Sequence, residues 1–167
     1  MTNKRIVIIG ASAAGKTTFA HALNTKLNLP LTLMDEVMWN PGWEYIGDTE
    51  TFAMLHKVAQ TEAWIIEGYI TKAARADLFE CADQIIYLDY PGYLMAWRYA
   101  LRVMKHRKNS RAELPGSPDS FSWKFLRLVY SKGEVWKLEE LFIENDWNDK
   151  IVRLKNPKQA AEFLKNI

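Results

Sequence analysis

Short runs of consecutive apolar residues alternate along the chain with longer segments whose apolar residues recur every three or four positions. The short runs are rich in Ile, Val and Leu, which is typical of strands buried on both faces of a parallel sheet. The longer segments have the spacing of helices that bury one face. Strands are predicted at 6–9, 31–34, 64–66, 83–89 and 151–154, and helices at 17–27, 49–60, 71–80, 121–130 and 134–145, with further helices beginning at 91 and 157.

This alternation of strands and helices predicts an α/β protein, with three α/β/α layers around a five-stranded, mostly parallel sheet. A length of 167 residues suits one domain, 1–167, that buries a sizeable core. Phe125 and Val129 are expected in that core. Trp123 and Trp136 are also expected to pack there, in preference to lining a pocket.

The first predicted strand leads into a glycine-rich segment that fits G-x-x-x-x-G-K-[ST] without a mismatch. Strand, glycine loop and helix N-terminus together form an anion cradle, because the backbone N–H groups point inward and the helix end adds about half a positive charge. The residues expected to hold the phosphates of a nucleotide are Gly10, Ala11, Ser12, Ala13, Ala14, Gly15, Lys16, Thr17 and Thr18.

Within this P-loop, the glycines and the two polar side chains at its end have different tasks. Gly10 and Gly15 permit backbone conformations and close approaches that a Cβ would obstruct. Lys16 is expected to reach the β- and γ-phosphates as a catalytic residue, and the Thr17 hydroxyl is expected to hold Mg²⁺. The segment therefore predicts a site for ATP and Mg²⁺.

Acidic residues follow three other predicted strands, at the sheet edge where ligands gather in open α/β folds. Asp35 either binds Mg²⁺ through water or accepts a proton from a substrate hydroxyl. Glu67 is a second candidate metal ligand, and Gly68 after it permits close approach of the backbone. Asp89 is either a Walker-B-type acid or the N-cap of the next helix, and we favour the cap. Arg75 is either a surface residue or a clamp for an anionic acceptor.

Positive charge is concentrated between positions 98 and 132, where nine Lys or Arg residues face two acidic residues. Arg98, Arg102 and Lys105 recur at helical spacing, which predicts one shared face. A Pro- and Gly-containing loop follows at 109–118, as in a mobile lid. Arginines on a closing lid would neutralise charge on the γ-phosphoryl group and exclude water. We favour this hypothesis over a solvated surface or a nucleic-acid patch.

The overall composition narrows the class of protein. Hydrophobic residues make up 49 % and charged residues 25 %, the balance of a soluble globular protein. A formal net charge of +2 does not by itself imply a polyanionic partner. No apolar run approaches the roughly 20 residues that span a bilayer. Cys81 is the only cysteine, which excludes an internal disulfide, so we expect a cytoplasmic protein without a membrane partner.

Several longer motifs follow one another in a specific order. They are the P-loop, Asp35 with Trp39-x-Pro41-Gly42-Trp43, Trp64-Ile65-Ile66-Glu67-Gly68, the segment 82–91, Trp97-Arg98 and Phe121-x-Trp123-x-Phe125-Leu126. In this order they resemble the adenylate-kinase-like P-loop NTPases of the DNA topology modulation protein (FlaR-type) family, nearly from end to end. The two tryptophan-containing motifs are the specific part of the resemblance, because a P-loop alone marks only a superfamily.

The resemblance implies a nucleotide-kinase core with an acceptor-binding segment at about 35–60 and a lid at about 105–120. Relatives usually carry Asp at the position of Glu67, and the Pro-Arg pair of true adenylate kinases is missing after it. The resemblance places Asp35 at the acceptor, makes Arg98, Arg102, Arg107 and Arg111 candidate lid arginines, and puts Asn156 and Pro157 beside the adenine. The candidate acceptor contacts are Asp35, Trp39, Glu67, Gly68, Arg75 and Arg98.

These features predict an ATP- and Mg²⁺-dependent kinase that phosphorylates a nucleotide, a nucleoside or another small hydroxyl or phosphate acceptor. The alternative is a nucleotide-responsive regulator with weak ATPase activity that acts through DNA or a protein partner, and the basic stretch is its sequence support. A G-protein-type GTPase is disfavoured because the sequence contains no Asn-Lys-x-Asp. Both a monomer and a homodimer are compatible with the sequence.

Overall fold

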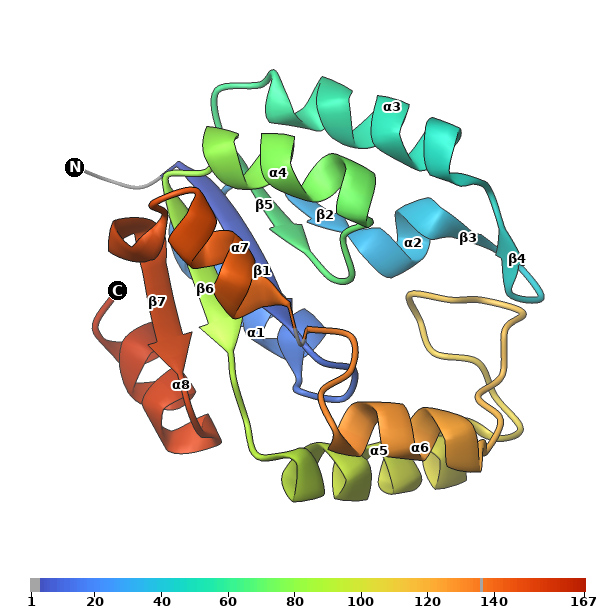
Figure 1. The fold of residues 1–167 in the computed structure, drawn as a ribbon. Helices are drawn as coiled ribbons and strands as arrows, with labels where there is room; N and C mark the ends of the chain where they lie inside the picture. Colours follow the sequence, from blue (N-terminus) through green and yellow to red (C-terminus); the bar gives the residue numbers. More distant parts are fainter. Residues whose placement is uncertain (1–3, 136) are drawn as a thin grey trace.

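The computed structural model describes residues 4–135 and 137–167. Its main sheet has five parallel strands in the order β2-β5-β1-β6-β7 (Figure 1). These strands are β1 (Arg5–Gly10), β2 (Leu31–Leu33), β5 (Trp64–Glu67), β6 (Gln84–Leu88) and β7 (Ile151–Leu154). The predicted fold class is confirmed, and β1, which carries the P-loop, lies at the centre of the sheet.

Helices cover both faces of this sheet. Their bounds are α1 (Lys16–Leu27), α2 (Met34–Met38), α3 (Asp48–Ala59), α4 (Lys72–Cys81), α5 (Gly92–His106), α6 (Trp123–Tyr130), α7 (Leu138–Glu144) and α8 (Pro157–Lys165), with a 3-10 turn at Asn148–Lys150. On one face α1 packs against α8, with the Phe19 and Phe163 rings 6.1 Å apart. On the other face α4 packs against α7 through Phe79 and Phe142.

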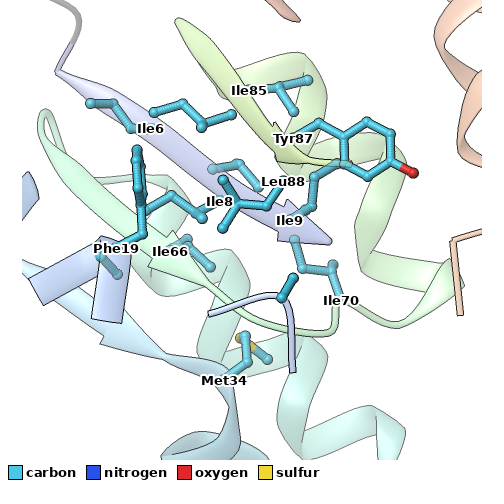
Figure 2. Packing of buried hydrophobic residues seen from close by; sticks show 14 of the residues in the cluster. Ile6, Ile8, Ile9, Phe19, Met34, Ile66, Ile70, Ile85, Tyr87 and Leu88 are labelled. Atoms are coloured by element: carbon cyan, nitrogen blue, oxygen red, sulfur yellow. The ribbon is translucent and has the colours of Figure 1, made fainter. Parts of the chain in front are cut away.

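The core lies between these layers and explains the continuous apolar runs of the strands. Ile8, Ile66 and Ile85 sit on three adjacent central strands and are fully buried (Figure 2). Because both faces of the sheet are covered, neither side of a central strand needs polar residues. The sheet therefore holds the end of β1 in a fixed position.

The pair α5 and α6 lies beyond the carboxyl ends of the strands (Figure 1). Tyr99 of α5 holds the end of the loop that connects the two helices. Its hydroxyl donates to the Ser120 carbonyl and accepts from the Ser122 N–H, both at 3.0 Å. The outer side of α5 is apolar and exposed, as at Trp97. Within the described residues, no helix is both long enough and apolar enough to cross a membrane.

The structure corrects the expectations for the end of the second strand and for Trp123. The second strand ends at Leu33, so Asp35 lies in the short helix α2, and the expected loop beyond it contains a hairpin of β3 (Trp39–Asn40) and β4 (Glu44–Tyr45). Trp123 is 75 % exposed, because α6 buries the side that carries Val129. Trp136 lies outside the described residues.

The helix cap expected at Asp89 is also wrong. The N-cap of α5 is Pro91, and no side chain caps this helix end. Asp89 instead accepts from Lys132 Nζ at 2.5 Å and pairs with Arg153 at 3.4 Å. Its carboxylate therefore ties the end of β6 to β7 and to the turn after α6.

Substitution of Ile8 by Ala should destabilise the protein by about 2–5 kcal/mol, because it leaves a cavity in the central strand of a closely packed core. Urea unfolding followed by circular dichroism measures the loss. Ile143→Ala is the control, since Ile143 is 69 % exposed and its truncation should change stability by no more than about 0.5 kcal/mol. Equal effects of the two substitutions would contradict this account of the core.

Candidate active site

The P-loop joins the central strand β1 to the N-terminus of α1. Gly10 has a φ of +154°, and a Cβ there would lie 2.8 Å from the Leu88 carbonyl oxygen of β6. Gly15 is the N-cap of α1 with a φ of +92°. Both glycines therefore adopt backbone conformations that favour glycine, and Gly10 also permits a close approach that a Cβ would obstruct, as the sequence predicted. Lys16 Nζ donates to the Ala11 carbonyl at 3.2 Å, so its ammonium group lies against the loop it follows.

A cavity of about 490 Å³ lies over this loop. The P-loop, the acidic strand ends and the basic face of α5 contribute to its walls. The predicted residues that line it are Gly10, Ser12, Ala13, Gly15, Lys16, Thr17, Thr18, Asp35, Glu67, Gly68, Arg98, Arg102 and Arg111. Ala11 and Ala14 are buried in the loop itself. The fold thus gathers most of the predicted residues around one space, which we call the P-loop cavity.

Arg98 supports the loop from the side of α5. Its guanidinium donates to the Ala14 carbonyl at 2.9 Å and lies 5.5 Å from the centre of the Tyr90 ring. This contact fixes the backbone carbonyl of Ala14 in the P-loop. Arg102 and Lys105 line the same cavity, so the predicted basic face of α5 is confirmed.

Glu67 and Thr17 form the candidate metal position. The Thr17 hydroxyl donates to Glu67 Oε2 at 3.1 Å, and Glu67 is only 4 % exposed. Burial raises the pKa of Glu67, and the positive charge of Lys16 opposes this shift. A hydroxyl and a carboxylate fit Mg²⁺, which uses few protein ligands and completes its shell with water and phosphate. Gly68 permits the arrangement, because a Cβ there would lie 2.6 Å from the Met34 Cβ.

A second cavity, of about 530 Å³, adjoins the first, and we call it the acceptor cavity. Its apolar walls come from Met38, Trp39, Trp43, Phe125 and Leu128, and its basic residues include Arg75, Arg102, Arg111 and Lys137. Ser12, Asp35, Tyr69, Arg102, Arg111 and Glu134 line both cavities. A group bound at the P-loop and a group bound between the aromatic rings would therefore meet at these shared residues.

Two arginines and two carboxylates alternate along this junction. Arg111 pairs with Asp35 at 3.2 Å, and its Nε lies 3.6 Å from Asp119, which Arg102 approaches to 3.4 Å. Burial lowers the pKa of Arg102, and the Asp119 carboxylate opposes the shift. Arginine stays charged in such surroundings. The junction therefore presents fixed positive charge close to Asp35.

The loop between α5 and α6 is packed against the β3–β4 hairpin, and its Arg111 lines both cavities. Ser117 Oγ accepts from the N–H groups of Gly42 and Trp43 at 2.9 and 3.2 Å. The Trp43 indole donates to the Pro118 carbonyl at 3.0 Å, and Arg111 lies 5.7 Å from its ring centre. The lid expected at 105–120 and the acceptor segment expected at 35–60 thus contact each other directly.

Some predicted residues lie elsewhere. Arg107 is exposed at the end of α5, and it lines neither cavity. Asn156 caps α8, where its side chain accepts from the Gln159 N–H at 2.9 Å, and neither it nor Pro157 lines either cavity. Arg75 faces the acceptor cavity, and it also donates to the Ile70 carbonyl.

Sequence reasoning did not single out Tyr69, Asp119 or Glu134. Glu134 binds the P-loop itself, since Ser12 donates to its carboxylate from both the backbone N–H and the hydroxyl. No motif marks this acid, which lies 122 positions from its partner along the chain. The Trp-x-Pro-Gly-Trp motif, in contrast, was a usable signal for Trp43.

No family model and no curated protein matches this chain. Solved structures do share its fold. A proposed kinase from Chloroflexus aurantiacus is 25 % identical over 79 % of this chain and 80 % of its own, with a TM-score of 0.57. A shikimate kinase from Acinetobacter baumannii is 18 % identical over 99 % of this chain and 90 % of its own, with a TM-score of 0.64. A gluconokinase from Sinorhizobium meliloti is 15 % identical over 98 % of this chain and 88 % of its own, with a TM-score of 0.59.

The likeness to these structures shows a P-loop kinase fold over nearly the whole chain. The narrower resemblance to DNA topology modulation proteins is not confirmed by any of these comparisons and stays a prediction. The shared fold places ligands at the carboxyl ends of the parallel strands, which is where both cavities lie.

Substitution of Glu67 by Gln should stabilise the nucleotide-free protein at pH 8. The raised pKa means that the folded state holds a proton more tightly than the unfolded chain, so ionised Glu67 costs stability above its folded pKa. The gain in the unfolding midpoint should be present at pH 8 and should shrink as the pH falls toward the ordinary carboxyl value of 4.5.

Thermal unfolding in the presence of a chelator, from pH 5 to 8, measures this difference. Glu62→Gln removes an equal charge from an exposed position, and its effect should be small at every pH. A loss of stability for Glu67→Gln at pH 8, or a gain independent of pH, would show that burial does not control this carboxylate.

Proposed function

We propose that this protein is an ATP- and Mg²⁺-dependent phosphotransferase that acts on a small molecule. The observation that carries the proposal is the junction of two cavities, one over a P-loop and one lined by aromatic and basic side chains, with Asp35 and Arg111 between them. A transferable phosphoryl group and its acceptor would be adjacent at this point. Similar solved structures include shikimate kinase and gluconokinase, which supports the same class of reaction.

The P-loop cavity is the proposed nucleotide site. Backbone N–H groups at the start of α1 and the helix dipole favour phosphate, and Lys16 adds a full positive charge. Thr17 and Glu67 would hold Mg²⁺, which supplies charge neutralisation on the phosphate oxygens when it is bound. Asn156 and Pro157, which lie outside this cavity, are the proposed contacts of an adenine ring that extends beyond it.

The acceptor cavity suits a compact molecule with an apolar or planar body and an anionic group. Trp39, Trp43 and Phe125 offer ring faces and edges, whereas Arg75 and Arg111 offer charge-assisted hydrogen bonds. A nucleotide has these properties, and so does a cyclic hydroxy acid. A shikimate kinase of similar fold was solved with shikimate, which is an acid of this kind.

Catalysis would come from positioning and electrostatics at the junction. Asp35 is the proposed base that accepts or orients the acceptor hydroxyl proton, while its Oδ2 is paired with Arg111. Arg102 and Arg111 then face the charge that develops on the transferred phosphoryl group. The packed loop around Ser117 would exclude water, which otherwise competes with the acceptor. Arg107 joins the site only if this loop moves.

We further propose a single domain, 1–167, with an acceptor-binding segment at about 35–60 and a lid at about 105–120. The regulator alternative gains no support from the geometry of α5, because Arg98, Arg102 and Lys105 face the P-loop cavity. A nucleic-acid surface would instead need these charges on the outside of the helix. Both a monomer and a homodimer stay compatible with the proposed reaction.

Lys16→Ala should reduce acceptor-stimulated ADP formation from ATP and Mg²⁺ by at least about 100-fold, because it removes the main positive charge on the β- and γ-phosphates. A panel of nucleosides, nucleoside monophosphates and hydroxy acids, with the product checked by mass spectrometry, identifies the acceptor. Lys26→Ala, in the last turn of the same helix, should leave the rate unchanged. Stimulation by no acceptor would count against a kinase.

Asp35→Asn should lower kcat by about 10²–10⁴-fold while nucleotide affinity changes little, since the amide cannot accept the hydroxyl proton. Steady-state kinetics with the identified acceptor and titration of ATP separate the two effects. Glu36→Gln removes the adjacent exposed carboxylate and should be silent. If both variants keep the full kcat, Asp35 has no role in the chemical step.

A further inference from the structure

A carboxylate occupies the P-loop at the junction of the two cavities. Glu134 Oε2 lies 2.6 Å from the backbone nitrogen of Ser12, and its Oε1 lies 2.8 Å from the Ser12 hydroxyl. Both oxygens accept from one loop residue, in the way that an anionic ligand would. The P-loop therefore already binds an anionic group of its own chain.

The turn that carries Glu134 is anchored on both sides. Gly133 donates from its N–H to the Leu128 carbonyl at 2.9 Å, and Val135 donates to the Lys132 carbonyl at 3.0 Å. Lys132 is in turn paired with Asp89 at the end of β6. These contacts aim Glu134 at the loop, so the contact with Ser12 is built into the fold.

The residues that line the two cavities indicate which phosphate of a bound nucleotide would lie at the contact between Ser12 and Glu134. Lys16 and Thr17 line only the P-loop cavity, whereas Ser12 and Glu134 line both cavities. A phosphoryl group that passes to an acceptor must lie where the cavities meet. With the nucleotide in the P-loop cavity, the Glu134 carboxylate would therefore lie where the terminal γ-phosphoryl group, which Lys16 also reaches, would contact Ser12.

We propose that Glu134 determines the nucleotide state that the site prefers. Its carboxylate takes the place of the γ-phosphoryl group on Ser12, so ATP must displace it, whereas ADP leaves the contact intact. Two anions cannot share the Ser12 N–H at hydrogen-bond distance, and their charges repel each other in a partly buried site. The inference rests on the proposed function, because it takes the P-loop cavity as the nucleotide site.

Titration of ATP and ADP with Mg²⁺ into wild type, Glu134→Gln and Glu140→Gln by calorimetry tests the proposal. Glu134→Gln should tighten the binding of ATP about tenfold, because it removes one close negative charge that repels the γ-phosphate. The binding of ADP should tighten by less than about twofold. Glu140 is exposed on α7 and lines neither cavity, so its variant should bind both nucleotides as wild type does. An unchanged ratio of the two dissociation constants, or weaker ATP binding, would overturn the proposal.

The Ser12 amide signal in ¹H–¹⁵N spectra gives a second readout that needs no nucleotide. It should shift between wild type and Glu134→Gln in the free proteins and coincide when both are saturated with ATP. Identical signals in the free proteins would overturn the proposal even if affinities changed. Failure of wild type to bind either nucleotide would instead overturn the proposed function, while this signal would still report the contact of Glu134 with Ser12.

Discussion

The site depends on how closely the end of β1 approaches β6. A Cβ at Gly10 would lie 2.8 Å from the Leu88 carbonyl, so this position must be glycine for the chain to turn there. The turn places the N-terminus of α1 directly beyond the buried centre of the sheet. Helix dipole, loop amides and the Lys16 ammonium then act on the same space. A phosphate cradle of this kind needs rigid support, and the closely packed core provides it.

Charge pairing organises the two cavities. Asp35 is paired with Arg111, Glu67 accepts from Thr17, and Glu134 accepts from Ser12. The same groups would serve phosphate, metal and acceptor in the proposed reaction. Ligand binding would therefore exchange one set of partners for another, and its net free energy would be much smaller than the individual contacts suggest. This exchange also gives a physical reason for a site that discriminates between ligands of different charge.

The helix α5 shows how one element serves several purposes at once. One side packs on α6 through Tyr99 and Phe125, another presents Arg102 to the cavities, and a third exposes Trp97. The spacing of the arginines predicted that they share a face. It did not reveal which part of the molecule that face contacts. In the structure the face meets the P-loop, through the contact of Arg98 with Ala14.

The amino-acid sequence is enough to predict the sheet and the P-loop, because buried strands and glycine turns depend on local pattern and backbone sterics. It did not determine that Asp89 is an ion-pair centre, that Trp123 is exposed, or that Glu134 reaches Ser12. These outcomes depend on which segments the fold brings together across long stretches of chain. Only the tertiary structure decides them, since an acidic or aromatic side chain carries no local signal of its distant partner.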